Sequence, residues 1–454
     1  MGIGNAIIRD SSNAAVVRSR MRFRQSTFFG ITLPLTVLLT AGWGPELAAA
    51  ENDTGTDPEA AEERLPLEQL RAFTEVLDRI RSSYVEPVSD ATLLENAIRG
   101  MLDGLDPHSA YLDEEAFRDL QEATSGEFGG VGIEVAIEDG LVRVISPIDD
   151  TPAERAGIRS GDVIVSLNDK PVTGMGLIDA VDSMRGEPGT DIKITVRRAG
   201  VEEPIDFDLV RDVIGVTSVR SRMLETGFGY LRISQFQTGT GKDVAKAVTA
   251  LEAEAGGELK GLIMDLRNNP GGVLRSSVEV ADTFLKKGVI VYTEGRLPNS
   301  ELRFNATGHD MIEGAPIVVL VNGGTASASE IVAGALQDHN RAVIMGTESF
   351  GKGSVQTVLP LTNERAIKLT TALYYTPNGR SIQLTGITPD ISVERATIRR
   401  EAPADRVRES DLPGHLGNAT RADARSDRFW SDDLQLLEAL NLLKGIHVLG
   451  LREE

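Results

Sequence analysis

The sequence contains no cysteine and only five histidines among its 454 residues. Without cysteine, the chain can form no disulfide, no thiolate metal site, no cysteine nucleophile and no lipid attachment at a lipobox cysteine. It also lacks the H-E-x-x-H pattern of zinc peptidases, so we expect no metal and no cofactor. The formal net charge is −21, which argues against nucleic-acid binding through a general basic surface.

The first fifty residues differ in kind from the rest of the chain. A basic region precedes an apolar run at 28–44, and three alanines then precede an abrupt polar stretch. This order is typical of a signal peptide, and we expect residues 1–50 to be removed by cleavage after Ala50. A start at Met21 would give a better-proportioned leader. An uncleaved anchor is the alternative, although Pro34 interrupts the run and the run is short for a membrane span. We therefore expect export to the bacterial periplasm, or to a plastid or thylakoid lumen, with membrane contact only through a leader that stays attached.

The pattern of apolar and polar residues changes several times along the remaining chain. Apolar residues recur at helical spacing from Leu67 to Ile80 and again over 91–105, which predicts helices. Short alternating strands follow from 122, and continuous apolar strands alternate with amphipathic helices from about 227. The second pattern predicts a largely parallel, helix-covered sheet. We therefore expect a multidomain α+β protein with a signal peptide (1–50), a linker and N-terminal helical region (51–121), a β-domain (122–212), an α/β core (213–395), a flexible linker (396–430) and a C-terminal helix (431–454).

The segment NGGTASASEI at 322–331 holds three hydroxyls, those of Thr325, Ser327 and Ser329. It lies between a predicted buried strand and a predicted helix. The unpaired N–H groups at a helix N-terminus suit a developing oxyanion, so one of these hydroxyls could be a nucleophile. The alternative is structural, because Ser327 and Glu330 have the spacing of a capping box. Taken alone, the segment favours the cap.

A nucleophilic serine needs a base, and the histidines are poorly placed to supply one. The nearest, His339, lies twelve residues after Ser327 at the far end of the same predicted helix. No G-x-S-x-G motif surrounds either serine, so a histidine-dependent, trypsin-like hydrolase is disfavoured. His108 is expected to be a turn or capping residue rather than a ligand.

Lysine is the other residue that activates a serine, provided that burial keeps its amine neutral. Lys352 lies between two glycines just before a predicted apolar strand, and Gln356 follows four residues later. If the two share a strand they lie on one face, and the amide could orient the amine without adding charge. In isolation Lys352 is more simply a surface lysine. The spacing by itself does not join Lys352 to Ser327.

Six motifs do join them: DPHSAYL, FGGVGIEV, GIRSGDVIVSLN, DLRNNPGG, NGGTASASEI and GKGSVQT, in that order. With these motifs, residues 65–395 resemble the carboxyl-terminal processing proteases, which are exported serine endopeptidases with a PDZ domain and a Ser–Lys pair. The resemblance implies that the β-domain is a PDZ domain and that the α/β core has a crotonase/ClpP-like serine protease fold.

The resemblance also implies a role for each motif residue. Ser327 matches the nucleophile, Lys352 the general base and Gln356 the supporting amide. Thr325 and Ser329 are then a turn residue and a helix residue. The oxyanion hole is implied to consist of the backbone N–H of Ala328 and that of either Gly271 or Gly272.

FGGVGIEV at 128–135 leads a glycine-rich turn into a strand. Such a turn can hold a peptide's terminal carboxylate while the open strand edge adds the peptide as a further strand. The alternative is a plain β-domain with a glycine-rich hairpin. The resemblance implies that Arg185, at the end of a predicted helix, couples the PDZ domain to the protease core; the alternative is a solvated helix-end cation. The predicted carboxylate site consists of Gly130, Val131, Gly132 and Ile133.

The resemblance implies two kinds of partner: the C-terminal segments of protein substrates and, in a homodimer joined through terminal helices, a second copy of the chain. An adaptor protein is a further candidate partner, and no nucleic acid is expected. The competing hypothesis is a catalytically silent PDZ-type peptide-binding or scaffold protein. It is disfavoured because Ser327, Lys352 and Gln356 are all present.

Overall fold

The structure is a computed structural model and describes residues 66–138, 140–297, 300–398, 413, 429 and 431–450. The predicted signal peptide and most of the predicted linker at 396–430 lie outside these residues. The residues up to Thr74 and those from Glu75 onward form two compact units. Among the described helices, none combines the length and apolar character that crossing a membrane requires.

The predicted helices of the N-terminal region are present as α1 (Leu67–Ser83), α2 (Asp90–Asp103) and α3 (Glu114–Ser125). Asp113 caps the N-terminus of α3, where its side chain accepts a hydrogen bond from Ala116 N–H, and Gly126 caps the C-terminus in the left-handed conformation. A helix cap of this kind contributes about 1 kcal/mol. Between α2 and α3 lies β1 (Ala110–Leu112), a strand that the sequence did not predict.

The β-domain has its own sheet, in the order β3-β4-β5-β7-β8, with every neighbouring pair antiparallel. β3 is an edge strand, and α5 (Leu177–Met184) packs against it. A separate ribbon pairs β2 (Glu127–Gly130) with β9 (Asp212–Gly215). The remaining elements are β3 (Ile133–Glu138), β4 (Leu141–Pro147), α4 (Pro152–Ala156), β5 (Val163–Leu167), β6 (Lys170–Pro171), β7 (Asp191–Arg197) and β8 (Ile205–Val210).

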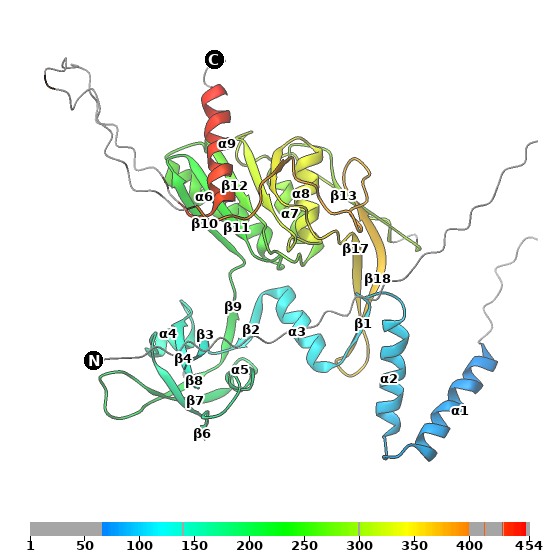
Figure 1. The fold of residues 1–454 in the computed structure, drawn as a ribbon. Coiled ribbons are helices and arrows are strands. Elements are labelled where there is room, and N and C mark those ends of the chain that lie inside the picture. The colour runs from blue at the N-terminus through cyan, green and yellow to red at the C-terminus, as the bar shows by residue number, and fades with distance from the viewer. Residues whose placement is uncertain are drawn as a thin grey trace, which may run out of the picture. The chain divides into compact units, whose positions relative to one another are not determined.

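The α/β core is built on the helix-covered, largely parallel sheet that the apolar runs predict. β11, β12, β15, β16 and β19 are parallel, and only the edge strand β10 is antiparallel. Alternate side chains of β12 and β15 face opposite layers, so both strands are buried throughout. One face packs against α6, α7 and α8, and the other packs against α9 (Figure 1). The elements are β10 (Val219–Glu225), β11 (Phe228–Ile233), α6 (Thr240–Ala255), β12 (Gly261–Asp265), α7 (Leu274–Asp282), β15 (Ile317–Val321), α8 (Ala328–Asp338), β16 (Ala342–Gly346), β19 (Ile391–Ser392) and α9 (Leu434–Gly450).

A second, antiparallel sheet completes the core. β18 is its central strand and pairs with β1, β13 and β17. The sheet therefore joins β1, from the N-terminal helical region, to strands more than 170 residues further along the chain. Its other strands are β13 (Val289–Gly295), β14 (Arg303–Asn305), β17 (Ser354–Pro360) and β18 (Ala366–Tyr375).

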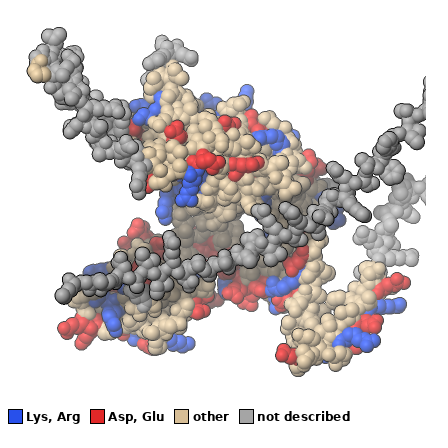
Figure 2. Space-filling model, viewed as in Figure 1, with Lys and Arg blue, Asp and Glu red and all other residues tan. Residues whose placement is uncertain are grey.

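The charged side chains of the described residues are of both signs on the face shown in Figure 2, where acidic and basic groups are interspersed.

The topology of the parallel sheet brings together the segments that matter for chemistry. The turns after β12, β15 and β16 leave neighbouring strands at the same edge, which is where open α/β sheets bind ligands.

Candidate active site

A cavity of about 400 Å³ lies where these turns meet the antiparallel sheet. Ser327, from the turn after β15, and Lys352, from the loop after β16, both line it. Gln356 on β17 and Lys368 on β18 line it as well, as does the last part of α3. Residues that are far apart in the sequence therefore share one concave site.

The three hydroxyls of the 322–331 segment have different environments. Thr325 is fully buried and donates from Oγ1 to the carbonyl oxygen of Leu266 at 2.8 Å. Ser329 is also fully buried and donates from Oγ to the carbonyl oxygen of Asn269 at 3.0 Å. Ser327 is the one of the three that lines the cavity. Two of the hydroxyls therefore hold the turn together, and the third faces the site.

Ser327 has an unusual backbone conformation, with φ 55° and ψ −116°. A residue with a side chain pays about 1–3 kcal/mol for such angles, so the surroundings must impose them. Within the described residues its hydroxyl makes no capping hydrogen bond, so the capping box that the spacing predicts is only half used. The other half is present, because Ser327 N–H donates to Glu330 Oε2 at 2.7 Å.

Glu330 connects the serine to the lysine. Its side chain is fully buried, and besides Ser327 N–H it accepts from Gly351 N–H at 2.7 Å, Lys352 N–H at 2.9 Å and Ser349 Oγ at 2.6 Å. Burial raises the pKa of this carboxyl, and the hydrogen bonds oppose that rise. The carboxyl group therefore fixes the backbones of both proposed catalytic residues to one point.

Tyr374 ties the same two residues together from their carbonyl side. It is buried on β18, and its hydroxyl contacts the carbonyl oxygen of Ser327 at 3.1 Å and that of Lys352. Burial raises its pKa well above the ordinary value, so the phenol stays protonated. Glu330 and Tyr374 thus clamp the two backbones through their N–H and C=O groups respectively.

Lys352 is half-buried, and burial is the main cause that lowers the pKa of its amine. The positive charge of Lys368 lowers this pKa further, while Asp106 and Glu330 raise it. β17 begins at Ser354, so Lys352 lies in the loop just before the strand, as predicted, and it does not share a strand face with Gln356. In the part of the chain that the structure describes, no hydrogen bond joins Lys352 Nζ to Ser327 Oγ.

Gln356 is oriented by its neighbours on the antiparallel sheet. Its amide nitrogen donates to Ser354 Oγ at 3.0 Å and to Thr370 Oγ1 at 3.3 Å. Thr370 lies directly opposite it on β18. The Nε2 end of the amide is therefore engaged by the sheet.

The turn after β12 carries the two candidate oxyanion glycines. Gly271 N–H donates to Asn269 Oδ1 at 2.9 Å, whereas Gly272 lines the cavity. A Cβ on Gly271 would lie 2.8 Å from Ser327 Cβ, so only glycine permits this approach to the serine. Ala328, also on the cavity wall, is the first residue of α8, whose first N–H groups have no partner within the helix.

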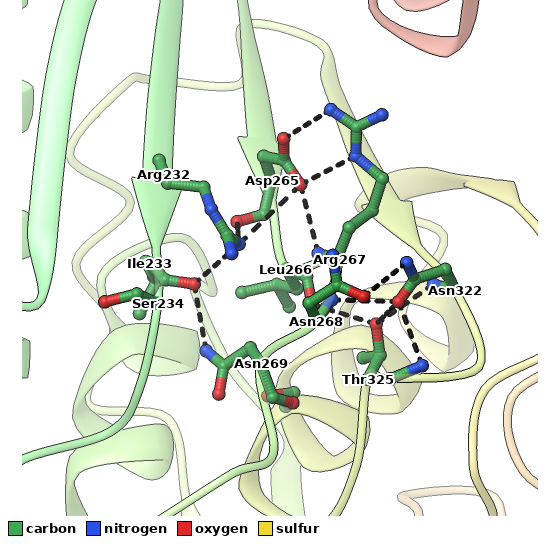
Figure 3. A network of polar contacts seen from close by, with 12 residues as sticks. Arg232, Ile233, Ser234, Asp265, Leu266, Arg267, Asn268, Asn269, Asn322 and Thr325 are labelled. Carbon is green, nitrogen blue, oxygen red and sulfur yellow. Dashed lines mark hydrogen bonds and ion pairs between the residues drawn. The ribbon is translucent and has the colours of Figure 1, made fainter. Parts of the chain in front are cut away.

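A polar network holds this turn against the sheet (Figure 3). Asn269 donates from Nδ2 to the carbonyl oxygen of Ile233 at 3.0 Å and accepts from Ala326 N–H on its own carbonyl oxygen at 2.9 Å. Asn268 and Asn322 exchange hydrogen bonds between the turns after β12 and β15. The turn that carries the glycines is thus tied to the turn that carries Ser327.

The predicted carboxylate site surrounds the start of β3. Gly130 ends β2, while Val131 and Gly132 form the turn and Ile133 begins β3. Val131 is buried in the core of the β-domain, and its carbonyl oxygen accepts from Ala153 N–H at 3.0 Å. Gly132 has φ 79°, and a Cβ there would lie 2.3 Å from Thr151 Cβ. The turn therefore requires a glycine, as the sequence suggested.

Arg185 is more than a solvated helix end. Its guanidinium forms an ion pair with Glu122 of α3 at 3.2 Å and lies 5.2 Å above the ring of Phe128. Other residues of α3 line the cavity. Arg185 thus connects the β-domain to a wall of the candidate active site.

The chain resembles known proteins over most of its length. Three family models match the chain: peptidase family S41 over residues 227–393, the PDZ domain over 143–198 and the activating protease CtpB N-terminal domain over 40–116. The carboxy-terminal-processing protease of Bartonella bacilliformis is 49% identical over 385 residues, which cover 83% of this chain and 88% of the relative. The chain belongs to the carboxy-terminal processing proteases.

Other relatives of this family resemble the chain over a smaller part of its length. The carboxy-terminal processing protease CtpA of Bacillus subtilis is 37% identical, over 70% of this chain and 67% of the relative. A solved photosystem II D1 C-terminal processing protease aligns with 31% identity and a TM-score of 0.43, over 72% of this chain and 92% of the other. Like its relatives, this carboxy-terminal processing protease is a serine peptidase with a PDZ domain.

Sequence reasoning did not assign four residues near the site of this carboxy-terminal processing protease. Lys368 and Tyr374 both lie on β18, and the sequence around them gives no indication of which residues they contact. Glu330 was recognised only as half of a cap. Asp106 belongs to the DPHS motif, in a region for which no chemistry was predicted. The motif itself was the only available signal.

Proposed function

We propose that this protease is an exported endopeptidase that hydrolyses peptide bonds with Ser327 as nucleophile, Lys352 as general base and Gln356 as supporting amide. One observation carries the proposal. A serine whose hydroxyl faces the cavity and a half-buried lysine with a lowered pKa line the same cavity. Glu330 and Tyr374 hold both of their backbones in place.

The chemistry follows from these positions. Neutral Lys352 Nζ takes the proton of Ser327 Oγ while Oγ attacks the carbonyl carbon of the scissile bond. The ammonium then gives that proton to the leaving amine, the C–N bond breaks, and the acyl group remains on Ser327. A water molecule, deprotonated by Lys352, attacks this ester and releases the second product, and Ser327 regains its proton.

For the oxyanion we propose the backbone N–H groups of Ala328 and Gly272. Gly272 lines the cavity, whereas the N–H of Gly271 is already donated to Asn269. Gly271 then has a different part, because its lack of a side chain lets the turn approach Ser327. Donors fixed before reaction stabilise developing charge without reorganisation.

We propose that the PDZ domain binds substrate C-termini along β3, with the carboxylate at the turn formed by Val131 and Gly132. Support comes from the edge position of β3 and from α5, which packs beside it. A peptide can add to such an edge as a further antiparallel strand. The ion pair of Arg185 with Glu122 supports a mechanical connection from this domain to the wall of the active site.

Export to the periplasm, action on envelope proteins and homodimerisation are further parts of the proposal. The leader pattern supports export. α1 supports assembly, because five of its apolar side chains are exposed, those of Leu67, Leu70, Phe73, Val76 and Ile80. An exposed apolar stripe of this kind is suited to another helix.

The decisive experiment replaces the base. Lys352→Ala and Lys352→Arg should both give folded, inactive protein, because a guanidinium stays protonated and cannot accept the serine proton. Cleavage of a fluorescently labelled unstructured protein measures the activity. His339→Ala and His108→Ala are the controls and should stay within a few-fold of wild type. An active Lys352→Arg enzyme would refute the dyad. It would also exclude the silent-scaffold hypothesis, because the protein would still cleave its substrate.

A further inference from the structure

The loop that follows α2 belongs to the N-terminal helical region, yet it reaches the strands of the active site. Asp106 Oδ1 accepts from Thr370 Oγ1 at 3.1 Å, and Ser109 Oγ accepts from Thr370 N–H at 3.1 Å. β1 continues the same connection by pairing with β18, with Ala110 opposite Lys368. The N-terminal region therefore contacts the strand that faces Gln356.

The Asp106 carboxylate is fixed within its own loop. Its Oδ1 accepts from His108 N–H at 2.8 Å and from Ser109 N–H at 3.0 Å, and its Oδ2 accepts from Ser109 Oγ at 2.7 Å. The hydrogen bond from the Ser109 hydroxyl is the main cause that lowers the pKa of Asp106 to about 2. Asp106 is thus an anion, and it can only accept hydrogen bonds, throughout the working pH range.

An ionised Asp106 dictates the direction of the hydrogen bonds beyond it. Thr370 has one hydroxyl hydrogen and must donate it to the carboxylate. Its oxygen can then only accept from Gln356, so the amide must turn its nitrogen toward Thr370, as observed at 3.3 Å. The Gln356 carbonyl oxygen is then turned away from Thr370, and in the cavity that both residues line it can accept from the ammonium of Lys352.

We propose that Asp106 is a positioning residue of the active site, which sets the hydrogen-bond direction of Thr370 and thereby orients the Gln356 amide for Lys352. The inference rests on the proposed Ser327–Lys352 mechanism and adds the N-terminal helical region to it. The DPHS motif thereby contributes to catalysis, although its loop comes before the PDZ domain in the chain.

The test compares Asp106→Asn with Asp103→Asn. Asp103 is an exposed residue at the end of α2, just before the loop that holds Asp106. The amide oxygen of the asparagine takes the place of Oδ1, because two backbone N–H groups donate there, and this uncharged oxygen holds the Thr370 hydroxyl less firmly. We expect kcat on an internally quenched peptide to fall about fivefold, the difference between a hydrogen bond to a charged acceptor and one to a neutral acceptor. KM should stay near that of Asp103→Asn.

The pH profile separates positioning from a merely structural role. The charged and titratable groups around Lys352 are Lys368 on β18, Glu330 on α8, and Asp106 and His108 in the loop after α2. The negative charge of Asp106 raises the pKa of Lys352. Its removal should therefore move the acid limb of kcat/KM to lower pH even as the plateau falls. A lower plateau with an unshifted limb would mean that the loop only supports the fold.

Variants of Thr370 keep the proposal testable if Asp106→Asn folds poorly. Thr370→Val should reproduce the loss of kcat, and Thr370→Ser, which keeps the hydroxyl, should restore most of it. The effects of Asp106→Asn and Thr370→Val should not add in the double variant, because both break one chain of hydrogen bonds. If Lys352→Ala is inactive but Asp106→Asn matches Asp103→Asn, this inference fails while the proposed dyad stands. If Lys352→Ala is active, the dyad itself fails.

Discussion

Replacing the two serines of the S-A-S-E run should have opposite effects. Ser327→Ala should abolish activity with little change in stability, whereas Ser329→Ala should lower stability and leave most of the activity. Ser327→Ala removes the proposed nucleophile but breaks no capping hydrogen bond, so the free energy of unfolding should change by at most about 0.5 kcal/mol. Ser329→Ala loses one buried hydrogen bond, to the carbonyl oxygen of Asn269, which costs about 0.5–1.5 kcal/mol. That carbonyl still accepts from Ala326 N–H, so no unsatisfied acceptor adds to the cost.

For a domain of this size, 1 kcal/mol corresponds to about 2–4 °C in the melting temperature. We therefore expect Ser327→Ala to melt like the wild type and to cleave nothing. Ser329→Ala should melt a few degrees lower and retain activity within a few-fold. Calorimetry and cleavage of a labelled unstructured protein, run on the same preparations, measure both quantities. A normally melting, inactive Ser329→Ala together with an active Ser327→Ala would show that the wrong serine has been assigned.

Three further predictions concern the base and the PDZ domain. Lys368→Met removes a positive charge that lowers the pKa of Lys352, so the acid limb of the pH–rate profile should move to higher pH; an unchanged limb would contradict this. Tyr374→Phe leaves the carbonyl oxygens of Ser327 and Lys352 without their shared donor, and kcat should fall while KM, read from the same titration, changes little. A peptide substrate with an amidated C-terminus should be bound more weakly than the free acid in a fluorescence-anisotropy titration, and equal affinities would exclude recognition of the terminal carboxylate.

Much of the core fold could be predicted because its signals are local. The runs that became β12 and β15 are short, apolar and followed by amphipathic helices, and both strands are buried throughout. The antiparallel sheet was not predicted as a unit, because β1 pairs with β18 across more than 250 residues. Strand pairing at such a separation leaves no periodicity in either segment.

The active site shows the same division. The motif makes Ser327 the proposed nucleophile, and its place at the start of a helix follows from the residues around it. Its link to Lys352 could not be derived from spacing, since Glu330 and Tyr374 join the two only in three dimensions. The hydrogen bond between Asp106 and Thr370 could not be predicted for the same reason, because it spans 264 residues.

A lysine that serves as both base and acid needs an environment of intermediate character. Burial and Lys368 lower the pKa of Lys352, which favours the neutral amine that can activate Ser327. Asp106 and Glu330 oppose them and stabilise the ammonium once it forms. One of these carboxylates comes from the core and the other from the N-terminal helical region, so both parts of the chain act on the pKa of Lys352.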